Sequence, residues 1–229
     1  MLGVDACPGG WIGLGWGGGE QVWGYTAPTV AELVAACRAD GPVAVLAVDI
    51  PIGLPDRAPR QADLAAREVL GPRRSSVFET PVRAALETPD HAIAVEVNQA
   101  ATGRGTSRQA HGLRHRVLEV DQWLRADVAG DRPAVYEVHP EVTFARMAGR
   151  PLADGKRTWA GAERRRMLLA REGLFVADIG AAGRRAAVDD VLDAAACAWT
   201  AARLMTGDAV SLPDPPEPMP DGLAAAIWV

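Results

Sequence analysis

The stretch LGVDACPGGWIGLGWGGGEQVWGYT, residues 2–26, decides how this chain begins to fold. It contains three short apolar runs, which the clusters Pro8-Gly9-Gly10 and Gly17-Gly18-Gly19 separate. Short apolar runs between Pro and Gly clusters are typical of strands joined by tight turns. We therefore predict an antiparallel meander. Its strands are expected at residues 2–7, 11–16 and 21–26.

A helix and a buried strand are expected after this meander. Apolar residues recur at positions 30, 33, 34 and 37, which is the spacing of an amphipathic helix. The run VAVLAVDI, residues 43–50, is continuous and rich in β-branched side chains. Such a run is typical of a strand buried on both faces, as in the middle of a parallel sheet. The order strand-strand-strand-helix-strand predicts an α/β protein with a mixed sheet.

The rest of the chain combines an irregular segment with further regular elements. Residues 57–131 are rich in Arg, Pro and polar side chains, and we interpret them as a helical and loop insertion after the fourth strand. The insertion belongs, on this interpretation, to a single domain of residues 1–229. Further helices are expected at residues 60–70, 113–123, 140–147, 162–171 and 189–205, a strand at 133–139, and a Pro-rich loop with a short apolar tail at the end.

Composition excludes several classes of protein. Hydrophobic residues make up 48% of the chain and charged residues 23%, which is ordinary for a globular domain and excludes wholesale disorder. No apolar run approaches the roughly 20 residues of a membrane-spanning helix, and the first residues lack the pattern of a secretory signal. The three cysteines are too widely spaced for a disulfide framework or a zinc site. We expect a soluble, reduced, cytoplasmic protein that does not bind membranes.

Three acidic residues stand at or near the ends of predicted strands. Asp5 and Asp49 close apolar strands, and Glu137 lies inside the strand expected at 133–139. A carboxylate in a buried strand is costly unless it is paired or binds a metal ion. One such acid alone is best explained by a structural hydrogen bond. Three in one small sheet favour a functional site.

Two more acids share one face of the last predicted helix. Asp190 and Asp193 are three residues apart, so their side chains lie on the same side. The opposite side is apolar, and the acidic side carries no further charge before Arg203. The helix is therefore expected to be covered on both sides, with its carboxylates directed at something other than bulk water. Asp189 is the residue that fits the alternative role of a helix cap.

Carboxylates that converge from strand ends and one helix form a site for hard divalent cations. Such a site favours Mg²⁺ or Mn²⁺. Two ions about 3.5–4 Å apart would activate a water molecule and stabilise the leaving oxygen in phosphodiester hydrolysis. The expected metal ligands are Asp5, Glu137, Asp190 and Asp193, with Asp49 as the alternative to Glu137 in the middle of the sheet.

Other residues are candidates for substrate binding and proton transfer. The sequence RRSS at 73–76 sets two guanidinium groups beside two hydroxyl groups, a combination that suits a phosphate. The segment around it is basic, since residues 57–116 hold ten arginines and six acids. His139 is expected either to move a proton or to orient a neighbouring carboxylate. The candidate phosphate ligands are Arg73, Arg74, Ser75 and Ser76.

Five motifs, in order, resemble those of a known prokaryotic family. They are GVDACPGGW at 3–11, VDIPIGLP at 48–55, RRSSVFETP at 73–81, YEVHPEVTF at 136–144 and DDVLDAAACAW at 189–199. They look like the motifs of domain-of-unknown-function family 429, regarded as nucleases of the ribonuclease H-like fold. The resemblance implies that fold, with helices on both faces of the sheet, and a Mg²⁺- or Mn²⁺-dependent nuclease. It implies Asp5 as the first-strand acid, Glu137 or Asp49 as the mid-sheet acid, and Asp190 and Asp193 as the helix acids.

Two other functions fit the same sequence. One is a nucleotide-binding phosphotransferase, whose phosphate would lie on the turn Pro8-Gly9-Gly10. The other is a non-catalytic protein that binds nucleic acid or a nucleotide and keeps its acids as structural residues. Metal titration would separate an enzyme from the binding protein, and ATP turnover would separate the phosphotransferase from the nuclease.

Overall fold

A computed structural model describes residues 1–19, 21–126 and 132–229. The chain divides into two compact units. The first unit comprises Met1–Asp49, Asp127–Val210 and Trp228–Val229. The second unit comprises Ile50–Ala126 and Ser211–Ile227. None of the helices in the described part of the chain has the length and apolar character needed to cross a bilayer.

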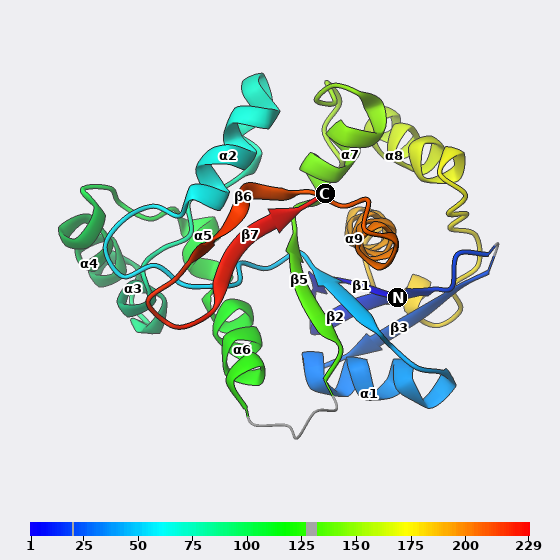
Figure 1. Cartoon of the computed structure of the whole chain (residues 1–229), viewed down its shortest axis with the longest axis horizontal. Helices are drawn as coiled ribbons and strands as arrows, with labels where there is room; N and C mark the ends of the chain where they lie inside the picture. The colour runs from blue at the N-terminus through cyan, green and yellow to red at the C-terminus, as the bar shows by residue number, and fades with distance from the viewer. Residues whose placement is uncertain (20, 127–131) are drawn as a thin grey trace. The chain divides into compact units, whose positions relative to one another are not determined.

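The first unit is built on five strands of a mixed sheet (Figure 1). The strands are β1 (Leu2–Cys7), β2 (Gly10–Trp16), β3 (Val22–Ala27), β4 (Val45–Val48) and β5 (Ala134–Val138). They lie in the order β3-β2-β1-β4-β5. β1 pairs antiparallel with β2, and β2 with β3, whereas β1–β4 and β4–β5 are parallel. The predicted meander and the predicted parallel central strand are therefore confirmed.

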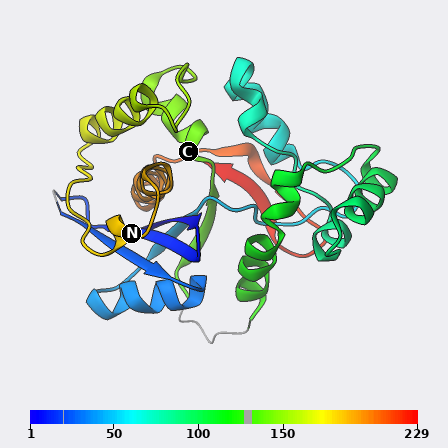
Figure 2. The same ribbon diagram turned by 180° about the vertical axis from the view of Figure 1, so that it is seen from behind.

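Helices cover both faces of these five strands, as Figures 1 and 2 show. The helices of this unit are α1 (Val30–Asp40), α7 (Pro140–Ala148), α8 (Trp159–Arg171), α9 (Val188–Thr206) and the short 3₁₀ helix η2 (Ala182–Arg184). A Cβ atom on Gly3 would meet α9, whereas one on Gly13 would meet Leu33 of α1, so the two helices lie on opposite faces. The N-terminus of α1 carries a capping box, in which Thr29 and Glu32 satisfy each other's backbone N–H groups.

The contact between β1 and α9 is unusually close because both elements present small residues. A Cβ atom on Gly3 would lie 2.1 Å from the backbone nitrogen of Ala198 and 2.2 Å from the carbonyl oxygen of Ala194. Both alanines are completely buried. Only glycine in β1 allows the helix backbone to approach this far, so Gly3 sets the distance between the strand and the helix.

The second unit contains most of the remaining elements. They are α2 (Gln61–Leu70), η1 (Gly71–Ser76), α3 (Arg83–Glu87), α4 (His91–Thr102), α5 (Arg108–Gly112), α6 (Arg114–Arg125), β6 (Ser211–Pro218) and β7 (Ala224–Trp228), of which Trp228 belongs to the first unit. Buried acids of this unit are bound by its arginines. Asp63 accepts hydrogen bonds from Arg60 and from the backbone of Thr80, and Asp121 accepts two from Arg83.

The segment after the fourth strand differs from expectation in several details. The expected helical and loop insertion at 57–131 contains helices joined by loops where it is described, and its last five residues, 127–131, lie outside the described residues. The helix His91–Thr102 was not expected individually. The Pro-rich segment Ser211–Pro218 was expected to be a loop but forms strand β6, which pairs with β7. β7 is its only partner among the described strands, and proline is tolerated in such an edge strand.

Replacing Gly3 with alanine tests the contact between β1 and α9. The added methyl group would overlap the backbone of α9, so we expect Gly3→Ala to lower the free energy of unfolding by roughly 1–3 kcal/mol or more. Urea denaturation measures the change. Gly17→Ala is the matched control, because nothing lies within 4 Å of a Cβ atom at that position. Equal urea midpoints for Gly3→Ala and Gly17→Ala would show that the close contact between β1 and α9 does not constrain the fold.

Candidate functional site

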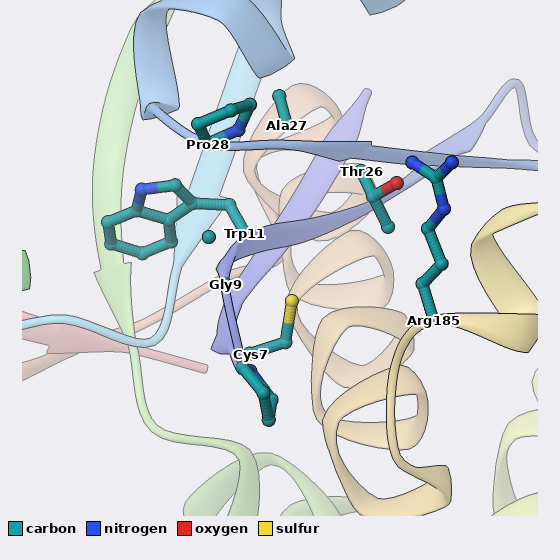
Figure 3. A pocket seen from close by; sticks show the side chains of 9 residues that line it. Cys7, Gly9, Trp11, Thr26, Ala27, Pro28 and Arg185 are labelled. Carbon is teal, nitrogen blue, oxygen red and sulfur yellow. The ribbon is translucent and has the colours of Figure 1, made fainter.

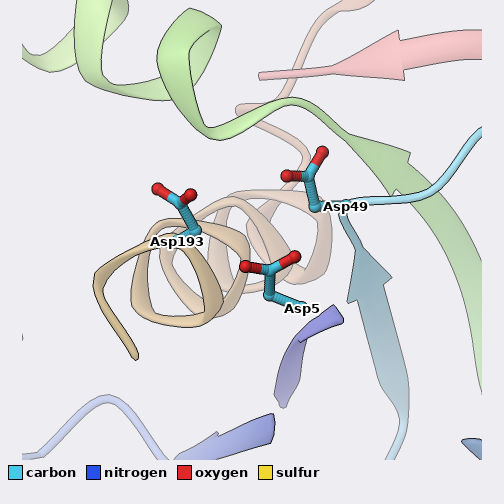
Figure 4. A group of neighbouring side chains, drawn as sticks. All are labelled: Asp5, Asp49 and Asp193. Atoms are coloured by element: carbon cyan, nitrogen blue, oxygen red, sulfur yellow. The ribbon is translucent and has the colours of Figure 1, made fainter. Parts of the chain in front are cut away.

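Three carboxylates from three different elements meet in the first unit (Figure 4). Asp5 lies in β1, Asp49 comes directly after β4, and Asp193 lies in the second turn of α9. One ligand atom of each lies within 4.8 Å of the corresponding atoms of the other two. The three side chains point toward one another over the end of the sheet.

The fold brings each of these residues to the site by a local rule. Asp5 is two residues beyond Gly3, so its side chain leaves β1 on the face that α9 covers. The backbone N–H of Asp49 donates to the carbonyl oxygen of Val4 over 3.0 Å, which continues the pairing of β4 with β1 as far as the carboxylate. Asp193 reaches the site because α9 approaches Gly3 closely at Ala194, the residue that comes directly after Asp193 in the helix.

Asp193 is the most deeply buried of the three, with an exposed fraction of 1%. Its Oδ2 atom accepts a hydrogen bond from Lys156 Nζ over 2.5 Å. Its Oδ1 atom is buried and has no hydrogen-bond partner among the residues that the structure describes. A buried carboxylate oxygen without a partner loses its hydration and gains nothing in return. This oxygen is therefore available to a ligand that the chain itself does not supply.

Burial and mutual repulsion raise the pKa values of the whole cluster. Burial, opposed by the charge of Lys156 and increased by that of Glu137, raises the pKa of Asp49 to about 7. Burial, again opposed by Lys156 and increased by Asp49, raises the pKa of Asp193 to about 7. The pKa of Asp5 is raised well above its usual range by burial and then by the charges of Asp49 and Asp193. A cation at this site would remove the repulsion that these shifts report.

The donor set fits a hard divalent cation. All three candidate ligands are carboxylates, the oxygen donors that Mg²⁺ and Mn²⁺ prefer, and this group contains neither a cysteine nor a histidine. The unpartnered oxygen of Asp193 gives such an ion a place to bind. The arrangement can therefore hold a cation between strand ends and a helix.

The other expected acids lie outside this group. Glu137 is buried in β5, where it pairs in register with Val48. Its neighbour Val138 packs against Cys197 of α9, so alternation along the strand turns Glu137 toward the opposite face. Asp49, one residue beyond Val48, is thus the mid-sheet acid that meets Asp5 and Asp193. Asp190 is half-buried in the first turn of α9, and burial followed by the charge of Asp189 raises its pKa.

His139 and the expected phosphate ligands are not members of the group of three carboxylates. His139 is the N-cap residue of α7 and is half-buried. The hydroxyl group of Ser76 donates to the carbonyl oxygen of Arg73 over 2.8 Å. Arg74 and Ser75 are exposed. The candidate phosphate ligands Arg73, Arg74, Ser75 and Ser76 all lie in η1 of the second unit, whereas the carboxylates belong to the first.

Lys156 is a functional candidate that lies outside the five motifs. It is the only lysine in a chain with 24 basic residues, and it lies in the loop between α7 and α8. Its ammonium group reaches Asp193, and its charge also acts on Asp49 and Asp5. The one available signal was the use of lysine itself in a chain that otherwise uses arginine.

A pocket of about 390 Å³ lies beside the turn between β1 and β2 (Figure 3). Gly9 and Gly10 in this turn have φ angles of +83° and +158°, and a Cβ atom on Gly10 would lie 2.1 Å from the carbonyl oxygen of Ala27. The side chains of Thr26 and Arg185 lie at one side of the pocket. The pocket is lined by Cys7, Pro8, Gly9, Gly10, Trp11, Thr26, Ala27, Pro28 and Arg185.

Comparison with known proteins gives one match. The model of a family described as protein of unknown function (DUF429) matches residues 3–218. The match spans all five motifs quoted above and every candidate site residue, so the family resemblance is confirmed. Neither curated proteins nor solved structures give a significant match to the chain.

The raised pKa values predict how stability depends on pH in the absence of divalent cations. An aspartate with a pKa of about 7 in the folded protein and about 3.9 in the unfolded chain takes up a proton on folding between these two pH values. Stability contributed this way is lost as the pH rises from about 4 to 7. Asp49→Asn removes one such group. We therefore expect the difference in midpoint temperature between this variant and the wild type, both in EDTA, to grow in favour of the variant by at least about 2–4 °C from pH 5 to pH 8.

Thermal unfolding at several pH values provides the measurement. The control is Asp40→Asn, because Asp40 is exposed at the end of α1 and lies outside the carboxylate cluster. Its midpoint should stay parallel to that of the wild type. If the midpoint temperature of Asp49→Asn also changes with pH in parallel with that of the wild type, Asp49 has no unusual affinity for a proton in the folded protein.

Proposed function

The chain belongs to DUF429, a family of proteins of unknown function, and we propose from its site that it is a Mg²⁺- or Mn²⁺-dependent phosphodiester hydrolase, a nuclease in the broad sense. One observation carries the proposal: Asp5, Asp49 and Asp193 converge in a largely buried cluster, and one oxygen of Asp193 has no hydrogen-bond partner among the described residues. Uncompensated buried carboxylates are costly, and a divalent cation is the ligand that offsets the cost.

The topology of the first unit supports the ribonuclease H-like part of this proposal. Three antiparallel strands, a helix and two parallel strands follow one another in the chain, in the spatial order β3-β2-β1-β4-β5. The acids come from the first strand, from the end of the adjacent parallel strand and from the closing helix. This is the distribution that the family resemblance implies, with Asp49 in the mid-sheet position.

Each residue of the site would have a separate role in this reaction. Asp5, Asp49 and Asp193 would hold the cation, which supplies Lewis acidity toward a phosphoryl oxygen. In hydrolysis the oxygen of a water molecule bonds to phosphorus, the bond from phosphorus to the leaving oxygen breaks, and that oxygen takes up a proton. The half-buried side chains of Asp190 and His139 are the candidates for donating that proton to the leaving oxygen or for orienting the water molecule.

The substrate proposed is a nucleic acid or a nucleotide. Arg73 and Arg74 form no ion pair with the residues that the structure describes, unlike Arg67 and Arg104, which both contact Glu79. Cationic side chains without an internal partner are suited to phosphate groups. We therefore propose Arg73, Arg74, Ser75 and Ser76 as the residues that bind the phosphate groups of the substrate.

The pocket at the turn of β1 and β2 favours a second candidate function. Its lining combines two glycines, the hydroxyl group of Thr26 and the guanidinium group of Arg185, which suits a small phosphate ester. A nucleotide-binding phosphotransferase would use it. Release of phosphate from ATP without cleavage of nucleic acid would favour this second candidate over the nuclease.

Asp5→Asn tests the proposed metal site and its chemistry together. Asparagine has nearly the same shape but lacks the charge, so we expect Mn²⁺-dependent cleavage of DNA or RNA to fall at least about 100-fold. The midpoint temperature in EDTA should stay the same or rise, because one repelling charge is removed. Added Mn²⁺ should raise the midpoint of the wild type much more than that of the variant.

The control for this experiment is again Asp40→Asn, which should cleave and respond to Mn²⁺ like the wild type. A variant Asp5→Asn that is less stable than the wild type yet still active would identify Asp5 as a structural residue. A wild type that cleaves none of a mixed panel of DNA and RNA substrates would leave the binding-protein alternative as the better explanation.

Replacing Arg73 and Arg74 together with alanine tests the proposed phosphate contacts. Each lost contact should reduce the slope of log affinity against log salt concentration by about 0.7–0.9, so the double variant should bind nucleic acid more weakly and with a flatter salt dependence. Fluorescence anisotropy over a salt series measures the slope. The matched control replaces Arg166 and Arg171, two exposed arginines of α8. An unchanged slope in the Arg73 and Arg74 variant would place the phosphate contacts elsewhere.

A further inference from the structure

Lys156 places a positive charge of the chain itself beside the carboxylate cluster. Its Nζ atom lies 2.5 Å from Asp193 Oδ2, and its side chain is 35% exposed, so the ammonium group faces both the carboxylates and solvent. Asp193 is its ion-pair partner, and the charges of Asp49 and Asp5 act on it as well. One end of Asp193 is thus bound by a cation of the chain itself, and the other end, Oδ1, is without a partner among the described residues.

The loop that carries Lys156 is held in place by contacts on both sides of this residue. Arg165 of α8 is completely buried, forms an ion pair with Glu141 and donates a hydrogen bond to the carbonyl oxygen of Asp154 over 3.2 Å. The hydroxyl group of Thr158 donates to the carbonyl oxygen of Gly155 over 2.9 Å. These contacts lie on both sides of Lys156 and fix the backbone from which it reaches Asp193.

Close packing at the start of α8 restricts the same loop further. A Cβ atom on Gly161 would lie 2.0 Å from the carbonyl oxygen of Gly155, so only glycine allows the helix and the loop to touch here. A flexible surface lysine would need none of this support. The arrangement presents Lys156 to the carboxylates as a fixed cation.

Lys156 offsets part of the negative charge of the cluster. Asp5, Asp49 and Asp193 contribute three negative charges when ionised, and Lys156 contributes one positive charge. Other acids also act on the three: Asp190 on Asp5, and Glu137 and Glu141 on Asp49, although Glu141 is itself ion-paired with Arg165. A second divalent ion would lie close to the ammonium group and would be repelled by it.

We propose that the site binds one divalent ion and that Lys156 holds the second cationic position, where its ammonium group contacts the phosphate of the substrate. This inference rests on the proposed function, because it assigns roles within the same carboxylate cluster. The ion would bind on the side of the free oxygen of Asp193, and Lys156 would donate a hydrogen bond to a phosphate oxygen from the other side. The hydrolysed phosphodiester would thus be held between a metal ion and an ammonium group.

The test counts Mn²⁺ ions on the full-length protein. Titration calorimetry gives the stoichiometry and affinity, and the electron paramagnetic resonance signal of unbound Mn²⁺ gives an independent count. We expect one ion per chain in the wild type and in Lys156→Arg, which keeps the charge. In Lys156→Met we expect two ions, the first bound at least about tenfold more tightly because the repelling charge is gone. Asp193→Asn should lose the single ion, which would assign that ion to this cluster.

The outcomes separate this inference from the proposed function. Two ions on the wild type, or the same count and affinity in Lys156→Met as in the wild type, would overturn the inference even if the protein cleaves nucleic acid. One ion on the wild type and two on Lys156→Met would support it even if no substrate is cleaved, an outcome that would remove the proposed function alone. A wild type that binds no Mn²⁺ would overturn both.

Discussion

The direct contact of the α9 backbone with β1 is the constraint on which the rest of the first unit depends. Gly3 leaves no side chain between the strand and the helix, and the backbone atoms of Ala194 and Ala198 face it directly. The same contact that packs the core also brings Asp193 to Asp5, two residues beyond Gly3. A larger residue in β1 would move the helix outward and separate the two carboxylates. Packing and function therefore depend on one distance.

This arrangement makes the metal-free site electrostatically unfavourable. Three carboxylates are gathered where burial already raises their pKa values, and only Lys156 offers them a positive charge within the described cluster. The fold tolerates the cost because the surrounding core of α9, β1 and β4 is apolar and closely packed. A cation that binds only the folded protein would recover part of this cost as stability.

The elements that sequence predicted correctly are those defined by local patterns. Short apolar runs between turn residues marked β1, β2 and β3, and helical spacing marked α1 and α9, so Asp5 and Asp193 could be placed on their elements. The choice between Asp49 and Glu137 depended on register: Val48 pairs with Glu137, which turns Glu137 away from α9 and leaves Asp49 facing it. Register between distant strands has no local signature.

The contact of Lys156 with the carboxylates has no local signature either. Its approach to Asp193 depends on tertiary contacts of Arg165 with Asp154 and Glu141, which join segments that no short motif connects. Strand β6 was missed because prolines normally mark loops, and only its position beside a single partner strand makes them acceptable.

The arginines of the second unit show why net charge alone is a weak guide to a nucleic-acid surface. Arg60 and Arg83 are used internally, where they bind the buried carboxylates of Asp63 and Asp121. These carboxylates largely compensate the charges of the two arginines, which therefore contribute little to the binding of a ligand from solution. Arg73 and Arg74 have no such partner among the described residues, although the sequence around them is no more basic. What distinguishes Arg73 and Arg74 from Arg60 and Arg83 is that they have no acidic partner among the described residues, a property of the folded chain and not of its composition.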